Sequence, residues 1–172
     1  MRARVVASAG MAALLAAVLA GCNFLTPTAT LKPYDPSDGV STVVGDVHVL
    51  NALILSDDGE DGNLIFSAVN ESGGPVRLTV QFDSAGTKTD LTLPLDDGSN
   101  DFGFGEQGQL LLAAIDAQPG GVVPIYFQYG SEQGKQLDVP VLDGTLEQYA
   151  PFLPTPVPTV TAGATPTPTP TP

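Results

Sequence analysis

Apolar and polar residues alternate along most of the chain between residues 43 and 142, which is the pattern of half-buried β-strands. The clearest strand covers residues 76–82, where one side is apolar and the other carries Arg77, Thr79 and Gln81. The same pattern predicts further strands over residues 47–55, 64–69, 91–95, 110–115, 123–128 and 136–141. Turn-forming residues separate them. These roughly seven or eight strands, with no helix-length amphipathic run, predict an all-β antiparallel sandwich of two sheets.

The alternation also predicts which residues face the core and which strand lies at an edge. The residues that should share one face of the strand over 47–55 are Val47, Val49, Leu53 and Leu55. Because the chain has no Trp, Phe66, Phe82 and Phe127 should supply much of the core. Pro94 marks an edge strand, since proline cannot donate to a ladder. The Gly-rich residues 96–108 are expected to form a loop.

The last two strands form a hairpin whose register the sequence predicts. Pairing their apolar positions places all of them on one face. The predicted pairs are Phe127 with Leu137, Ile125 with Val139, and Val123 with Val141. In this register Pro124 lies opposite Pro140, and the two fit as a pair without ladder hydrogen bonds.

Changes in composition divide the chain into four segments. We expect a leader over residues 1–21, a cysteine and tether over 22–42, the sandwich domain over 43–143, and a disordered tail over 144–172. The tail is rich in Pro and Thr and ends in a Thr-Pro repeat, which favours extended, solvated backbone. Nothing in it is expected to pack, so cutting the chain at Ala150 should cost little stability. Such repeats are candidates for O-glycosylation, and an unmodified tail is the alternative.

The leader has the features of a signal peptide that ends at a cysteine. Arg2 and Arg4 precede an apolar run over residues 5–20, and about 16 residues is short for a membrane-spanning helix. Residues 19–22 read Leu-Ala-Gly-Cys and resemble the lipobox of bacterial lipoproteins. The resemblance implies cleavage between Gly21 and Cys22 and lipidation of Cys22. It places the protein on the extracytoplasmic face of a cell membrane, with the lipid bilayer as its partner, because two or three acyl chains anchor stably.

Charge excludes one class of partner. Without Arg2 and Arg4 the formal net charge changes from −13 to −15. An acidic surface of this kind repels nucleic-acid phosphates and anionic lipid headgroups, so no nucleic-acid binding is predicted. The acidity serves solubility in the simplest interpretation, and binding of cations or of a basic partner is the alternative.

Few residues could carry catalysis or bind a metal. His48 is the single histidine, and it falls on an ordinary alternating strand rather than in a catalytic constellation. An enzyme is therefore not predicted, and neither is a cofactor. His48 and Asp46 are the weak candidates for a metal site, being two residues apart on one strand face.

Two acidic loops raise the question of calcium. Asp97, Ser99 and Asp101 have the spacing that begins an EF-hand loop, but Phe102 and Gly108 stand where the motif needs Gly and Glu. The other loop carries Asp57, Asp58, Glu60 and Asp61, which could chelate weakly. Plain turns are the preferred interpretation of both, since Asp is common in turns for backbone reasons.

Two blocks of sequence resemble periplasmic copper chaperones of the PCuAC type, and more closely a related group of actinobacterial lipoproteins. They are Gly-Asn-Leu-Ile-Phe-Ser-Ala-Val-Asn over residues 62–70, continuing to 82, and the Val-Pro-Ile-Tyr-Phe-Gln-Tyr hairpin over residues 118–141. The resemblance implies a Greek-key sandwich that is cupredoxin- or immunoglobulin-like. It also implies Cu(I) bound by paired His and Met, which are soft ligands.

The residues of this chain do not supply those ligands. Met1 and Met11 both lie in the leader. Where the family has its second His/Met pair, residues 108–112 read Gly-Gln-Leu-Leu-Leu. The predicted function is therefore a membrane-anchored cell-envelope lipoprotein with a non-enzymatic binding or scaffolding domain that lacks the family's metal site, and an envelope protein as a possible partner. The alternative is a copper-handling relative that uses a non-standard site.

Overall fold

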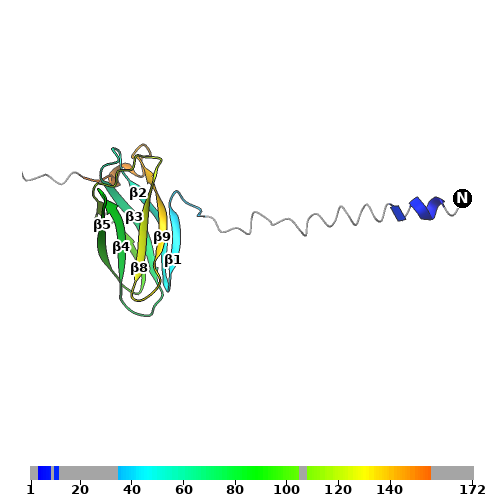
Figure 1. The fold of residues 1–172 in the computed structure, drawn as a ribbon, viewed down its shortest axis with the longest axis horizontal. Coiled ribbons are helices and arrows are strands. Elements are labelled where there is room, and N and C mark those ends of the chain that lie inside the picture. The colour runs from blue at the N-terminus through cyan, green and yellow to red at the C-terminus, as the bar shows by residue number, and fades with distance from the viewer. Residues whose placement is uncertain (1–3, 9, 12–34, 105–107, 156–172) are drawn as a thin grey trace, which may run out of the picture. The chain divides into compact units, whose positions relative to one another are not determined.

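The computed structural model describes residues 4–8, 10–11, 35–104 and 108–155. The chain divides into two units, residues 1–34 and 35–172. In the first unit the described residues are helical. Within the described residues of the second unit, nine strands and a short 3-10 helix form a β-sandwich (Figure 1).

The strands run in chain order as follows: β1 (Val40–Val44), β2 (Val47–Leu55), β3 (Gly62–Asn70), β4 (Val76–Ser84), β5 (Thr87–Leu95), β6 (Gly98–Phe102), β7 (Leu111–Leu112), β8 (Val122–Tyr129) and β9 (Lys135–Leu142). The helix η3 (Ala150–Phe152) follows them. The predicted all-β fold class is confirmed. Two of the strands, β1 and β6, lie where the sequence predicted a tether and a loop.

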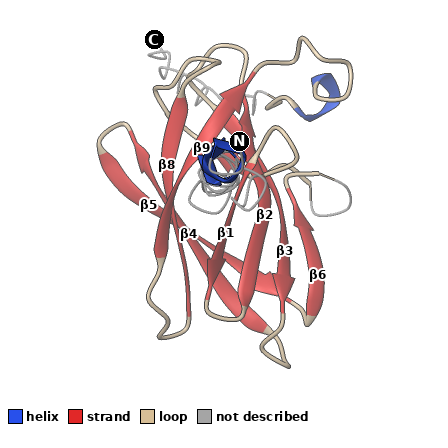
Figure 2. Ribbon diagram, turned by 90° about the vertical axis from the view of Figure 1, so that its right-hand side faces the viewer, coloured by secondary structure: helices blue, strands red, loops and turns tan. Residues whose placement is uncertain are grey.

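Two antiparallel layers make up the sandwich. One contains β1, β2, β3, β6 and β7, and the other has the order β5-β4-β8-β9. Figure 2 shows β5 and β6 at opposite sides of the fold. The chain passes between the layers after β3, β5 and β7. A short parallel pairing of Ile54 with Val141 and of Leu55 with Leu142 joins β2 to β9, so the layers form one curled sheet.

The core between the layers is built from the faces that the alternation predicted for β4, β5, β8 and β9. Phe66, Phe82 and Phe127 are buried, as expected. Phe66 stacks on Phe102 at 5.0 Å between ring centroids and meets Phe127 edge-on at 5.7 Å. Each aromatic pair of this kind stabilises the folded state by about 0.5–1.5 kcal/mol beyond the contribution of burying its surface. Pro94 lies on β5, which ends the strand order, so the predicted edge strand is confirmed.

The predicted face of β2 is wrong in its second half, because the strand contains a β-bulge. The pairing of β2 with β3 shifts between Leu50 and Leu53, and Asn51 has a positive φ of 51°. An extra residue in a strand places every side chain after it on the opposite face of the sheet. The side chains of β2 that join the main core are Val47, Val49, Ala52 and Ile54. Leu53 and Leu55 lie on the opposite face, in a second apolar cluster.

The predicted register of the β8–β9 hairpin is also wrong, although its faces are right. Ile125 pairs with Leu137 and Val123 with Val139, so each residue is displaced by two from the prediction. A shift of two keeps every side chain on its face. Pro124 therefore lies opposite Asp138 rather than opposite Pro140. The apolar pattern fixes the face, but it is satisfied equally by both registers.

Two segments that the sequence placed outside the sheet belong to it. The strand β6 pairs with β3 from Phe66 and Phe102 to Asn70 and Gly98, where a loop over residues 96–108 was expected. The apolar side chain of Phe102 enters the core and draws this Gly-rich stretch into the ladder. The sandwich also begins at Val40, earlier than the expected boundary at residue 43, because Val40 packs against the core.

Residues 149–155 contradict the expectation that nothing in the tail packs, and we call them the strap. Tyr149, Phe152 and Leu153 pack against the second apolar cluster, in which Leu53, Leu55 and Ile65 are at most 8% exposed. The Tyr149 hydroxyl donates to Asp38, which raises the pKa of that hydroxyl above 10.0. Residues 156–172, which hold the Thr-Pro repeat, are outside the described part of the chain.

Ending the chain after Gln148 should lower its stability, whereas ending it after Thr155 should not. The first cut uncovers Leu53, Leu55 and Ile65 and removes a hydrogen bond from a buried amide. Together these changes should cost about 2–4 kcal/mol, a fall of roughly 10 °C in Tm. Thermal denaturation followed by circular dichroism measures the difference. Equal Tm values for the two chains would show that the strap contributes nothing.

Candidate functional site

His48 and Asp46, the weak candidates for a metal site, have different neighbours. His48 lies on β2, and its Nε2 is 3.6 Å from Glu71 Oε2. Asp46 lies in the turn between β1 and β2, where its carboxylate accepts from the Tyr129 hydroxyl at 3.3 Å. His48 thus contacts Glu71, and Asp46 contacts Tyr129, whereas the sequence paired His48 with Asp46. In the described part of the chain, no three His, Cys, Asp or Glu side chains are grouped so as to hold a metal ion.

The acidic loop between β2 and β3 is held together by its own carboxylates. Asp58 Oδ1 accepts from the Glu60 N–H at 2.9 Å. Asp57 Oδ1 accepts from the Gly144 N–H at 2.9 Å, and Asp61 Oδ1 from the Ala114 N–H at 3.0 Å. Two of these hydrogen bonds join the loop to neighbouring segments. The Asp residues thus have a structural role, which is to accept hydrogen bonds from backbone N–H groups.

Asp58 is the carboxyl in this loop with a shifted pKa. The Glu60 backbone N–H lowers the pKa of Asp58 below its ordinary value of 3.8, and the backbone N–H of Asp61 and the Ser56 hydroxyl act in the same direction. Hydrogen bonds to the charged form favour that form. The shift therefore has a structural cause, the closing of a turn.

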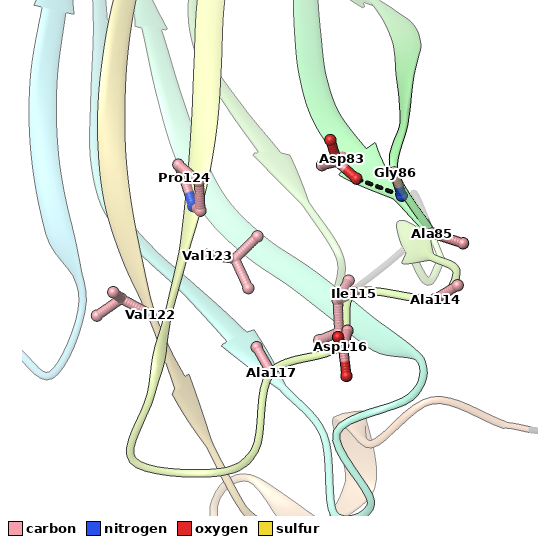
Figure 3. A pocket seen from close by; sticks show the side chains of 10 residues that line it. All are labelled: Asp83, Ala85, Gly86, Ala114, Ile115, Asp116, Ala117, Val122, Val123 and Pro124. Atoms are coloured by element: carbon pink, nitrogen blue, oxygen red, sulfur yellow. Dashed lines mark hydrogen bonds between the residues drawn. The ribbon is translucent and has the colours of Figure 1, made fainter.

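Two adjoining hollows lie beside this loop. The first, of about 330 Å³, is lined by Asp83, Ala85, Gly86, Ala114, Ile115, Asp116, Ala117, Val122, Val123 and Pro124 (Figure 3). The second, of about 470 Å³, shares Ala85, Ala114 and Asp116 and adds Asp58, Gly59, Glu60, Asp61 and Gln118. Ala85, Ala114 and Asp116 all have positive φ, near 50°. The carboxylates that line the two hollows, together with the small side chains between them, give an acidic surface. His48 lines neither hollow.

Residues 108–112, where the resemblance implied a His/Met pair, contact the strap. Gln109 Nε2 donates to the Leu153 carbonyl at 2.6 Å, and Gln109 Oε1 accepts from the Thr155 N–H at 3.0 Å. The Leu110 N–H donates to Asn63 Oδ1 at 2.8 Å. Polar side chains here bind backbone groups of the same chain.

Asn63 is the residue at this place that sequence reasoning missed. Its side chain is fully buried. Its Nδ2 donates to the carbonyls of Gly103 and Phe152, both at 2.8 Å. Its position within the apolar strand over residues 62–70 is the signal that could have identified it, because a buried amide requires hydrogen-bond partners from other segments.

Cys22 and Gly21, the predicted sites of lipidation and cleavage, are outside the described residues, so the geometry does not bear on them. In the leader, residues 4–8 and 10–11 are helical. None of the helices within the described ranges has both the length and the apolar character that crossing a bilayer requires.

Comparison with known proteins gave matches to solved structures. No protein-family model matches the chain. No curated protein matches it either. The apo PCuAC domain of PmoF2 is similar with 17% identity and a TM-score of 0.46, over 62% of this chain and 98% of that domain. The copper-bound PCuAC domain of PmoF2 is similar with 16% identity and a TM-score of 0.44, over 60% of this chain and 98% of that one.

Both structures are PCuAC domains, the kind of domain that the two sequence blocks resemble. At this level of similarity the functional argument for the chain rests on its own residues.

The contribution of Asp58 to stability should depend on pH. A folded-state pKa below 3.8 gives a contribution that is present above that pH and is lost as the pH falls through the folded pKa. The difference in Tm between the wild-type chain and Asp58→Asn should therefore be constant near neutral pH and shrink below pH 3.8. Thermal melts at a series of pH values measure it. A difference that does not change with pH would contradict the assigned hydrogen bonds.

Proposed function

We propose that the protein is a cell-envelope lipoprotein, anchored through Cys22, whose β-sandwich is a non-enzymatic binding or scaffolding domain. The anchoring is supported by the basic, apolar leader that ends in Leu-Ala-Gly-Cys. A diacylated cysteine would hold the protein at the membrane surface without a spanning helix. The binding role is supported by the metal ligands that the chain lacks and by the positions of its titratable groups.

We prefer a binding role to copper transfer because the chain has few side chains that could bind Cu(I). After the leader the sequence contains no methionine, the single thiol is the one proposed to be lipidated, and His48 is the single imidazole. Cu(I) prefers several soft sulfur and imidazole ligands held together. One imidazole beside the Glu71 carboxylate, 3.6 Å away, is a poor match for that ion.

The positions of the titratable groups favour binding over catalysis. His48 lies on the outer side of β2, with 38% of its side chain exposed, rather than in a cleft. Asp57, Asp58 and Asp61 each accept a hydrogen bond from a backbone N–H and so stabilise loops. General acid–base catalysis needs such groups positioned at a substrate site.

Replacing the proposed lipidation site should release the protein from membranes. Cys22→Ser removes the thiol that would carry the lipid, so the protein should move from the membrane fraction to the soluble fraction, with its sandwich still folded. Cell fractionation and circular dichroism measure the two effects. Mass spectrometry of the wild-type N-terminus should show a lipidated Cys22, and an unmodified cysteine would overturn the proposal.

Purified soluble domain should not bind Cu(I) with a fixed stoichiometry. Competition with a chromogenic Cu(I) chelator measures retention, and the chelator should keep the ion because the domain offers one soft ligand. His48→Ala should leave the melting temperature nearly unchanged, since the ring is partly exposed and contacts a surface carboxylate. Tight one-to-one retention that His48→Ala abolishes would instead favour the copper-handling alternative.

A further inference from the structure

One side of β5 is a free sheet edge. The strand ends the order of its layer, so β4 lies along one side of it. Figure 2 shows the other side of β5 at the margin of the fold. The pairing of β5 with β4 runs from Ser84 and Thr87 to Val76 and Leu95 without a shift in register. β5 is therefore a regular strand of nine residues whose outer side could pair with another strand.

The turn before β5 shows which residues present their backbone groups to the free edge. Ala85 and Gly86 have φ of 50° and 81°, as a two-residue type I′ hairpin requires. The pair next to such a turn, Ser84 and Thr87, is hydrogen-bonded, and hydrogen-bonded and non-hydrogen-bonded pairs alternate from there. The residues of β5 that therefore present both N–H and C=O to the free edge are Lys88, Asp90 and Thr92.

This edge lacks the devices that commonly keep a strand from pairing with another molecule. Protected edges are short, carry a bulge or have charged side chains that point inward. On the inner face of β5, Leu91 and Leu93 pack against the core, and the neighbouring inward position is Thr89. Pro94, which has no N–H, limits pairing to the stretch before it. Residues 87–92 are thus open to a partner strand.

The charged residues of β5 complement a second copy of the same strand. Lys88 and Asp90 are exposed and lie two residues apart on the outer face. In an antiparallel pair with a two-fold axis at Thr89, Lys88 of each copy lies directly opposite Asp90 of the other. Both residues present N–H and C=O to the edge, so each of these opposite pairs also exchanges two backbone hydrogen bonds. Opposite charges in such positions stabilise a strand pair.

The neighbouring two-fold registers are less favourable. An axis at Lys88 or at Asp90 would place like charges directly opposite each other, which is destabilising. An axis at Leu91 would place Lys88 opposite Pro94, which has no N–H to donate. Of these four axes, the one at Thr89 is the one that joins opposite charges. Charge and proline together therefore specify a single register.

The same argument distinguishes β5 from β6, which ends the strand order on the other side. β6 has five residues, and its one charged residue is Asp101, so a second copy there would bring acid against acid. By contrast, β5 carries one acid and one base in a chain whose formal net charge is −13. Within the described part of the chain, Lys88 forms no ion pair. Its charge is therefore available to a partner.

We propose that two copies of this chain pair edge to edge through β5, antiparallel about a two-fold axis at Thr89. The layer β5-β4-β8-β9 then continues from one copy into the other. A two-fold contact of this kind is closed, because it uses the free edge of β5 in both copies. The proposal goes beyond the proposed function and does not depend on lipidation. The interface is small, so a covalent bond is the suitable means of capturing the dimer.

The test uses the chain from residue 22 onward with Cys22→Ser, so that an introduced cysteine is its single thiol. Thr89→Cys places that thiol on the axis, where the Cα atoms of a non-hydrogen-bonded pair lie about 4.5 Å apart, within reach of a disulfide. Leu91→Cys is the matched control on the same face, because its two copies would lie about 14 Å apart. Oxidation by diamide and non-reducing electrophoresis measure the rate of crosslinking. Thr89→Cys should crosslink on the order of tenfold faster than Leu91→Cys.

Charge reversal tests the register by a second route. In the Thr89→Cys chain, Lys88→Asp should slow crosslinking about tenfold, because acid then faces acid. Adding Asp90→Lys to that chain restores opposite charges across the axis and should restore the rate. Both positions are exposed, so the variants should keep the fold, and circular dichroism verifies it.

Fast crosslinking at Thr89 that Lys88→Asp slows and the double exchange restores supports the proposal. Equal rates for Thr89→Cys and Leu91→Cys overturn it, because they indicate random collision. Absence of crosslinking in both chains, or a rate that Lys88→Asp leaves unchanged, overturns it as well. If Thr89→Cys unfolds the chain, the combination of Thr87→Cys with Leu91→Cys replaces it, since these two residues lie opposite each other across the proposed axis.

Discussion

The hydrogen bonds of the buried Asn63 amide hold together the end of the sandwich at which the strap docks. Its three hydrogen bonds join β3 to the Gly103 carbonyl, to the Leu110 N–H and to the Phe152 carbonyl. Each of these three groups is at least 40 residues away from Asn63 in the sequence. A buried amide that has all its partners fixes their relative positions, since losing any one leaves a polar group without a partner. Asn63 thus contributes, together with Gln109, to holding the strap on the sandwich.

The β-bulge at Asn51 has an equally wide effect. By inserting one residue into β2 it turns Leu53 and Leu55 away from the main core and toward the outer face. Asn51 tolerates a positive φ, and its Oδ1 accepts from the Gly39 N–H at 2.9 Å, so the bulge is stabilised locally. An outer face with two buried leucines needs a cover, which the strap provides. Leu53 and Leu55 therefore belong to the second apolar cluster, which the strap covers, because of one irregularity in β2.

The fold class and most inward faces could be predicted from the sequence, because burial imposes a period of two on a strand. The bulge could not, since a single Asn in an apolar run gives no local signal that the period will shift. The hairpin register failed because a displacement of two satisfies the same pattern, so that Ile125 meets Leu137 rather than Val139. The candidate site of His48 and Asp46 was predicted from residue type and spacing, which do not show which partners these side chains meet in the fold. The roles of Asn63 and Gln109 depend on long-range contacts with the strap. The apolar strand around Asn63 indicates that its amide is buried, but it does not indicate which segments bind that amide.

Taken together, these contacts describe a domain whose polar side chains bind segments of polypeptide. Within residues 108–112, Gln109 binds the strap through both its amide nitrogen and its amide oxygen. Side-chain amide exchange measured by NMR tests whether the strap is docked through Asn63. Both Nδ2 protons of Asn63 should exchange slowly, because one is held by the Gly103 carbonyl and the other by the Phe152 carbonyl. Exchange at the rate of a free asparagine side chain, with no cross-peak between Asn63 and Phe152, would contradict the account.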